Sequence, residues 1–431
     1  MGGAPADPPQ DPPQDPPQDR IAPPAFLAEP APAAVLAALP GARAVGGCVR
    51  DALAGRPVHD VDVAAPLPPD EIAQRLRDAG LKVFETGLAH GTVTAVLARQ
   101  PVEVTALRRD VATDGRHAEV AWTTDWREDA ARRDFTVNAM SLDAAGQLWD
   151  YFGGRVDLAA GRVRFVGDPA TRLAEDYLRA LRFFRFWARY GQGEPDAAAL
   201  AAIRDAVPGL RQRIAPERVW MELKRLFEAP EPVFALGLMR QTRVMEAVLP
   251  EARGLDPLSR LVARGAPADP LLRLASLLPS GAAPALAARL RLSGEERARL
   301  ERMVANPVGA LSDSDKSGRP LRVWLARHGA MASALDALWL AEAADGQDRA
   351  ACRARIAALA VPVFPLLGRD LLALGLPPGP GVGALLDALR RWWMEGGAEA
   401  DRATCLGEAK RRLEGAGAAY GPAAPADPEA R

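Results

Sequence analysis

The sequence predicts an α+β protein with an N-terminal mixed-sheet head, followed by an all-helical neck, body and tail. Short β-branched segments alternate with helical stretches from about residue 42 to 149, as in a compact unit of strands and helices. After residue 154, stretches rich in alanine, leucine and arginine are separated by Pro and Gly, which indicates helices with few strands. With 431 residues, 48% of them hydrophobic, the chain has room for roughly two to four compact units.

The predicted boundaries begin with a proline-rich tail. Residues 1–25 contain the repeat DPPQDPPQDPPQD, which has no side chains able to form a core and predicts a disordered or polyproline-like segment. We expect the head at 26–153, the neck at 154–215, and the body and tail at 216–414. The last segment, 415–431, has the same character as the first.

Composition narrows the functional class. The formal net charge of −1 gives no sign of a polyanion partner, so a nucleic-acid site must come from local clusters of arginine. Cys48, Cys352 and Cys405 lack the spacing of a zinc site, which indicates buried thiols in a reducing compartment. The chain shows neither a signal-peptide pattern nor an apolar run of roughly 18 residues. We therefore expect a cytoplasmic protein with no membrane partner and no obligatory protein partner.

The head opens with a glycine pair between a short apolar strand and a helix. Gly46 and Gly47 precede a helix that is expected to begin near Cys48. Glycines in this place let a phosphate approach the backbone N–H groups at the helix start. Taken alone, such a pair is more often a purely structural turn.

Three carboxylates are predicted on two short strands. Asp60 and Asp62 are two residues apart, so both should point to one face of a strand while Val61 and Val63 point to the core. Adjacent carboxylates repel each other unless a cation lies between them, and their hard oxygen ligands suit Mg²⁺. Glu103 completes the group if its strand is a neighbour. A solvated strand face is the alternative for an isolated DxD.

The best-delimited helix is expected to run without a break over residues 169–190. Asp168 is a candidate N-cap, and Pro169 fits the first helical position. Gly191 follows Tyr190 and is predicted to end the helix in a left-handed conformation.

Several motifs, taken in order, resemble a known family. GGCVRD at 46–51 followed by DVD at 60–62 resembles the nucleotidyltransferase superfamily that includes DNA polymerase beta. RRDFTVNAM and EDYLRALRFFRF resemble CCA-adding tRNA nucleotidyltransferases and the related bacterial poly(A) polymerases. The matching region covers roughly residues 40–225 and includes APERVWMELKRLF. The resemblance implies that the head is a nucleotidyltransferase domain, that the neck selects the nucleobase and that the helical body binds tRNA.

The resemblance also implies a role for each matching residue. Asp60 and Asp62 would hold two Mg²⁺ ions, one lowering the pKa of the RNA 3′-hydroxyl and the other binding the triphosphate, so that attack on the α-phosphorus expels pyrophosphate. Glu103 would assist as a third acid, and Asp51 is expected to pair with its neighbour rather than to touch substrate. The residues implied to bind the triphosphate and ribose are Gly46, Gly47, Arg50, Arg133, Asp134 and Asn138.

Base selection without a template would depend on Asp176 and Arg179, which are one turn apart in the predicted helix. The carboxylate accepts from the exocyclic amine of cytosine or adenine, and the guanidinium donates to the neighbouring ring nitrogen. Uracil and guanine present an oxygen in place of the amine and would be rejected. In the family, Arg182 and Arg185 also contact the nucleotide, and Glu175 is expected to brace Arg179. A solvated, ion-paired helix surface is the default explanation for any one of these charges.

The expected activity is addition of C, C and A to the 3′ end of tRNA from CTP and ATP. The related poly(A) polymerases typically carry a basic segment of the form GRRFRLVHV after the DxD, whereas this chain has FETGLAHGTVTAV at 84–96. The polar stretch RRDVATDGRHAEV at 108–120 fits the flexible loop that full CCA enzymes use for the final adenosine. Poly(A) addition, partial addition and an inactive helical RNA-binding protein are the alternatives.

Overall fold

The structure is a computed structural model whose chain forms two compact units. The first unit contains the chain up to residue 252 together with 288–292, and the second contains 253–287 and the chain from 293 onward. The residues that the structure describes are 19–87, 91–113, 118–305, 319–328, 331–358 and 360–415. Most of both predicted tails lies outside these ranges.

The head contains the mixed sheet that the sequence predicts. Its strands lie in the order β1-β10-β9-β2-β3-β6-β5-β4, and of the described pairs only β3 (Asp62–Ala65) with β6 (Gln100–Ala106) is parallel. The other strands are β1 (Asp19–Arg20), β2 (Arg43–Val45), β4 (Lys82–Gly87), β5 (Thr92–Leu97), β9 (Met140–Leu142) and β10 (Gln147–Asp150). Because β1 pairs with β10, the sheet begins inside the segment that was expected to be a tail.

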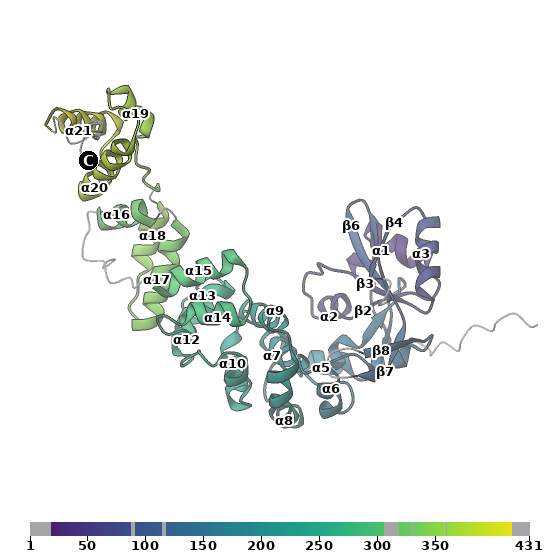
Figure 1. The fold of residues 1–431 in the computed structure, drawn as a ribbon. Coiled ribbons are helices and arrows are strands. Elements are labelled where there is room, and N and C mark those ends of the chain that lie inside the picture. The colour runs from purple at the N-terminus through teal and green to yellow at the C-terminus, as the bar shows by residue number, and fades with distance from the viewer. Residues whose placement is uncertain are drawn as a thin grey trace, which may run out of the picture. The chain divides into compact units, whose positions relative to one another are not determined.

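Helices α1 (Pro30–Ala38) and α3 (Pro69–Asp78) cover one face of this sheet (Figure 1). Their apolar side chains form a core with Val63 and Val104. Successive side chains on a strand point to opposite faces. The other face therefore carries the acidic residues at the alternate positions.

A two-stranded ribbon stands where the flexible loop was expected. Strands β7 (Arg108–Thr113) and β8 (Ala118–Trp122) pair in antiparallel fashion, and the segment 114–117 lies outside the described residues. Paired strands satisfy each other's backbone N–H and C=O groups, which an open loop would leave to water. The prediction of a flexible loop is therefore wrong for its two flanks.

Beyond the head, the first unit is helical, as predicted, and no described strand follows β10. Along the chain, helix α4 (Trp126–Ala131) and the 3₁₀ turn η3 (Thr136–Asn138) come between strand β8 of the ribbon and strands β9 and β10 of the sheet. The helices that follow are α5 (Gly154–Ala159), α6 (Pro169–Glu175), α7 (Arg179–Tyr190), α8 (Ala197–Arg213), α9 (Pro216–Phe227), α10 (Pro232–Gln241) and α11 (Val244–Val248).

The prediction of one continuous helix over 169–190 is wrong, because the chain breaks between α6 and α7. Asp176 has extended backbone angles (φ −153°, ψ 107°), and its Oδ1 accepts a hydrogen bond from the backbone N–H of Leu178 at 3.0 Å. An aspartate that bonds the backbone two residues ahead favours a turn over a helix interior. The predicted start is confirmed, since Asp168 accepts from the Thr171 N–H at 2.8 Å.

Helix α7 buries its aromatic side chains in the first unit. Phe183 is fully buried and packs against Phe135 and Phe165, whose ring centroids are 4.9 Å apart. Phe183 therefore belongs to the core and is not available as a base-stacking platform. The helix ends at Gly191 with φ −69°, so the predicted left-handed stop is wrong.

The second unit is helical throughout its described residues. It contains α12 (Asp256–Ala263), α13 (Pro270–Leu277), most of α14 (Ala283–Arg289), α15 (Gly294–Ala305), α16 (Arg319–His328), α17 (Met331–Asp345), α18 (Ala350–Ala358), α19 (Gly368–Ala373), α20 (Pro380–Glu395) and α21 (Arg402–Gly415). All three cysteines of the protein are buried thiols, as predicted. Across the described part of the chain, every helix is too short or too polar to cross a bilayer.

Candidate active site

The predicted carboxylates meet at the parallel pair of strands. Asp62 begins β3, and its Cα partner on β6 is Glu103, so the two strands are neighbours, which the sequence left open. Burial raises the pKa of Asp62, and the charges of Glu103 and Asp60 act in the same direction, whereas Arg133 opposes them. Asp60 lies before the strand rather than on it.

This group of acids fits a divalent cation that is shared with a nucleotide. Within the described ranges, no three His, Cys, Asp or Glu side chains converge closely enough to hold a metal ion on their own. Mg²⁺ is usually held by one or two carboxylates, by waters and by substrate phosphates. A cation would also relieve the repulsion between carboxylates that raises the pKa of Asp62. The donor set therefore fits a metal ion whose remaining ligands come from a triphosphate.

The turn between β2 and helix α2 (Gly47–Leu53) requires glycine at its first position. Gly46 has a φ of 70°, which strains other residues, and a Cβ there would lie 2.9 Å from Nη1 of Arg133. The same Nη1 donates to the backbone carbonyl of Asn138 at 3.3 Å. The missing side chain thus allows an arginine from the motif RRDFTVNAM to approach the turn.

Arg50 is held in one orientation by its neighbours. Its Nε and Nη2 donate to Asp51 at 3.0 to 3.1 Å, as predicted, and its Nη1 donates to Oδ1 of Asn138 at 2.5 Å. The rings of Phe186 and Tyr190 lie 5.0 and 4.7 Å from its guanidinium carbon. Only 8% of the residue is exposed, so Arg50 has little freedom to turn elsewhere.

Asp134 binds protein donors on both of its oxygens. Its Oδ1 accepts from Nδ2 of Asn138 at 2.9 Å, and its Oδ2 accepts from Arg182 at 2.6 to 2.7 Å. Burial would raise the pKa of this carboxyl, but the charge of Arg182 and these hydrogen bonds outweigh it and lower the pKa. Asp134 therefore holds Asn138 and Arg182 in place.

Asp176 and Arg179 lie on the same cavity, although not for the predicted reason. The helix break removes Asp176 from α7, and its Oδ2 instead accepts from Nη2 of Arg218 at 2.7 Å. Glu175 pairs with Arg179, as expected. The Arg179 guanidinium also donates to two backbone carbonyls at 3.1 Å each. Among the described residues, its Nε and one Nη2 hydrogen are left for a ligand.

Two further arginines of α7, Arg182 and Arg185, share a buried glutamate. Nε of Arg185 donates to Glu222 at 2.6 Å, and Nη1 of Arg182 lies 3.7 Å from the same carboxylate. Glu222 is on α9 and is only 5% exposed. Glu222 on α9 therefore holds the side chains of Arg182 and Arg185 in place.

One cavity of about 520 Å³ collects these side chains. Every residue predicted to bind the nucleotide lines it, and so does Asp62, whereas Asp60 and Glu103 do not. Its remaining lining residues are Arg132, Leu178, Phe186, Arg218 and Arg225.

The position of two missed residues could have been found in the sequence. Arg218 and Arg225 lie in the segment APERVWMELKRLF, seven residues apart on α9. That interval is close to two helical turns, so both belong to one helix face. Phe186 belongs to the buried aromatic group of α7 and still reaches the cavity.

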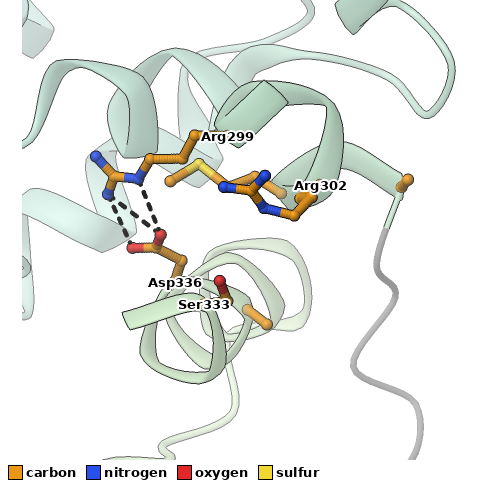
Figure 2. Close-up of a pocket in the computed structure, with 7 residues that line it drawn as sticks. Arg299, Arg302, Ser333 and Asp336 are labelled. Atoms are coloured by element: carbon orange, nitrogen blue, oxygen red, sulfur yellow. Dashed lines mark hydrogen bonds and ion pairs between the residues drawn. The ribbon is translucent and has the colours of Figure 1, made fainter. Parts of the chain in front are cut away.

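A smaller cavity, of about 250 Å³, lies between α15 and α17 of the second unit (Figure 2). Arg299 points at Asp336 there, with Nη2 and Oδ2 3.2 Å apart, and it also binds Asp269 at 2.7 Å. These two carboxylates neutralise the arginine. The cavity therefore suits a triphosphate much less well than the arginine-rich cavity of the first unit.

Comparisons with known proteins agree with this geometry. Residues 42–164 match a family model described as the poly A polymerase head domain, and residues 194–255 match one described as a probable RNA and SrmB-binding site of polymerase A. The mitochondrial CCA tRNA nucleotidyltransferase 1 of Mus musculus is 35% identical over 380 residues, which cover 86% of each chain. A CCA-adding enzyme of Streptococcus gordonii is 42% identical over 188 residues, covering 43% of this chain and 46% of that one.

A solved structure extends the likeness along the chain. The CCA-adding enzyme of Bacillus stearothermophilus, crystallised in complex with CTP, matches with a TM-score of 0.72 and 26% identity. The match covers 90% of this chain and 99% of that one. The chain therefore belongs to the family of CCA-adding tRNA nucleotidyltransferases.

Proposed function

We propose that this protein adds C, C and A in turn to the 3′ end of tRNA, using CTP and ATP and releasing pyrophosphate. The observation that carries the proposal is the single cavity that holds both Asp62 and the pair Asp176 and Arg179. An acid at the reaction centre and a pair that reads the base must lie within one nucleotide of each other. A cavity of about 520 Å³ meets this condition. The relatives named for CCA addition support the choice of substrate.

Members of this family generally use a divalent metal ion. We propose that Asp60 and Asp62 hold two Mg²⁺ ions, with Glu103 assisting. Bound there, one ion would lower the pKa of the RNA 3′-hydroxyl and the other would neutralise charge on the triphosphate. The chain's own residues orient the reactants around these ions.

The phosphates and ribose would be bound by groups from the turn and from the motif RRDFTVNAM. Gly46, Gly47 and Arg50 line the cavity and would face the triphosphate, and Arg133 lies beside the same turn. Asn138 would contribute a further hydrogen-bonding side chain beside Arg50 and Arg133. The fixed contacts of Asp134 support a positioning role for that carboxylate in place of direct nucleotide binding.

Base selection would use Asp176 and Arg179 as the hydrogen-bonding edge of a missing partner base. Asp176 accepts from the exocyclic amine of cytosine or adenine, and the free donors of Arg179 reach the ring nitrogen beside it. The carboxylate is pinned by Arg218 at 2.7 Å, so it cannot easily turn away from an oxygen offered by uracil or guanine. That mismatch leaves acceptors facing each other, which is strongly unfavourable in a partly buried site.

Incubation with a tRNA that lacks its last three nucleotides, a divalent metal ion and labelled CTP or ATP tests the proposal. We expect three additions, C, C and A, after which extension stops. Long A tracts would instead support poly(A) addition. Extension that stops after two added nucleotides would support partial addition. Incorporation of neither nucleotide would end the enzyme proposal and favour an RNA-binding protein.

We further propose that the helical segments 154–215 and 216–414 serve base selection and tRNA binding, respectively, as the resemblance implies. Arginines that contact RNA phosphates should make tRNA affinity fall with rising salt concentration. The cytoplasmic location stays a prediction. The mitochondrial names of the vertebrate relatives make cell fractionation the direct test of compartment.

A further inference from the structure

The end of α7 is tied to the start of α2 by one side chain. Tyr190, the last residue of α7, is 8% exposed, and its hydroxyl donates to Oδ1 of Asp51. The same oxygen accepts from Nε and Nη2 of Arg50 at 3.1 Å each. The Tyr190 ring also lies 4.7 Å from the guanidinium carbon of Arg50. Tyr190 thus touches Arg50 directly through its ring and indirectly through Asp51.

The contacts of Arg50 within the protein leave few of its N–H donors free for a ligand. An arginine has five N–H donors. Those on Nε and Nη2 are directed at Asp51, and Nη1 donates to Asn138. A second Nη1 hydrogen has no hydrogen-bond partner among the described residues and remains for the cavity. Its direction depends on where Asp51 holds the guanidinium plane.

We propose that Tyr190 is a positioning residue for nucleotide binding, which fixes Asp51 and thereby aims the remaining donor of Arg50 at the triphosphate. This inference rests on the proposed function, in which Arg50 contacts the triphosphate. Tyr190 does not line the nucleotide cavity; it lines a separate cavity of about 400 Å³ together with Arg56 and Arg189. Its effect on a nucleotide therefore passes through its neighbours.

The Tyr190 hydroxyl also weakens the mutual neutralisation of Arg50 and Asp51. Asp51 and Arg50 would otherwise neutralise each other, and a hydrogen bond donated to the carboxylate takes up part of its acceptor capacity. Arg50 then keeps more of its attraction for phosphate oxygens. Burial raises the pKa of Tyr190, and the contact with Asp51 also raises it, although Arg50 opposes them. The phenol therefore stays protonated at neutral pH and remains a donor.

The variant Tyr190→Phe tests this inference because it keeps the ring and removes only the hydroxyl. We expect the Kd of CTP, measured by calorimetry without RNA, and the KM for CTP to rise about three- to ten-fold. The kcat should change less than about two-fold, because positioning for binding is lost and chemistry is not. The Kd of CMP, which lacks the two outer phosphates, should rise much less than that of CTP.

A double-mutant cycle shows whether the effect passes through Asp51. In an Asp51→Asn background, Tyr190→Phe should add little further loss of CTP affinity, because the carboxylate on which it acts is gone. Equal weakening of CTP and CMP, an unchanged CTP affinity, or an undiminished effect in the Asp51→Asn background would each overturn the proposal.

The matched control is Tyr177→Phe. The Tyr177 ring packs on Gly209 and near Arg213, and no hydrogen bond of its hydroxyl is present among the described residues. CTP affinity should stay at the wild-type value in this variant, and both variants should unfold near the wild-type temperature. A wild-type protein that binds CTP but extends no tRNA would refute the proposed function, while the CTP measurements would still decide the role of Tyr190.

Discussion

Replacing Glu222 with Gln should destabilise the first unit, because two cavity arginines lose their shared carboxylate. Removing one partner of a buried ion pair costs about 3–5 kcal/mol. The cost should be smaller here, since Arg182 is 31% exposed and keeps its bond to Asp134, and glutamine still accepts one hydrogen bond from Arg185. We expect a loss of about 2–3 kcal/mol in the free energy of unfolding. For a unit of this size, that lowers the melting temperature by about 4–12 °C.

Urea unfolding followed by circular dichroism measures this loss, with Glu217→Gln as the matched control on the same helix. The Glu217 side chain is 47% exposed, and its partner Arg291 is 66% exposed. Exposed pairs contribute about 0–1 kcal/mol, so the control should stay within about 1 kcal/mol of the wild type. Equal unfolding midpoints for the Glu222 and Glu217 variants would refute the reasoning.

Three further predictions follow from the same site. Asp60→Ala should abolish incorporation of CTP and ATP into a shortened tRNA on a gel, and a near-wild-type rate would remove this acid from the reaction. Gly46→Ala should weaken CTP binding in calorimetry by about ten-fold, because its Cβ would meet Nη1 of Arg133 at 2.9 Å. Gly55→Ala, with a similar φ of 66° and open space around it, should bind CTP normally, so equal losses would show that only backbone strain matters. Because the pKa of Asp134 is lowered in the folded state, its stabilising contribution is complete above the ordinary pKa of about 3.9 and is lost as the pH falls through the lowered value. Urea midpoints measured from about pH 6 to 2.5 should therefore drop only at the acid end, less so for Asp134→Asn, and an identical drop in both proteins would contradict this.

The position of the acids could be predicted because it depends on a local pattern. Alternation of valine and acid along two short segments places Asp62 and Glu103 on one face of each strand. The sequence left open whether the two strands are neighbours. Their parallel pairing in register supplies the part that only the assembled sheet determines.

The break at Asp176 illustrates why the neck was predicted less well. The segment has the helical pattern on both sides, and a single aspartate inside such a pattern is compatible with a helix. What decides the conformation is a side chain bond to the backbone of Leu178 together with the ion pair to Arg218, which is 42 residues away in sequence. Contacts over such distances have no local signal, and the same holds for the pair of Arg185 with Glu222.

The partners of a charged motif residue were harder to predict than its location. RRDFTVNAM was expected to bind a nucleotide, and its residues Arg132, Arg133, Asp134 and Asn138 line the cavity. The sequence did not reveal that both oxygens of Asp134 are used within the protein. A motif marks where polar groups gather, whereas their division between ligand and scaffold depends on the tertiary arrangement.

The central claim is that Asp176 and Arg179 read the base in place of a template. Incorporation of all four nucleotides into one shortened tRNA, compared between the wild type and Asp176→Ala, tests it most directly. We expect the wild type to accept only CTP and ATP and the variant to admit UTP or GTP while keeping substantial activity. An equal loss of incorporation for every nucleotide, with no new base accepted, would contradict the account.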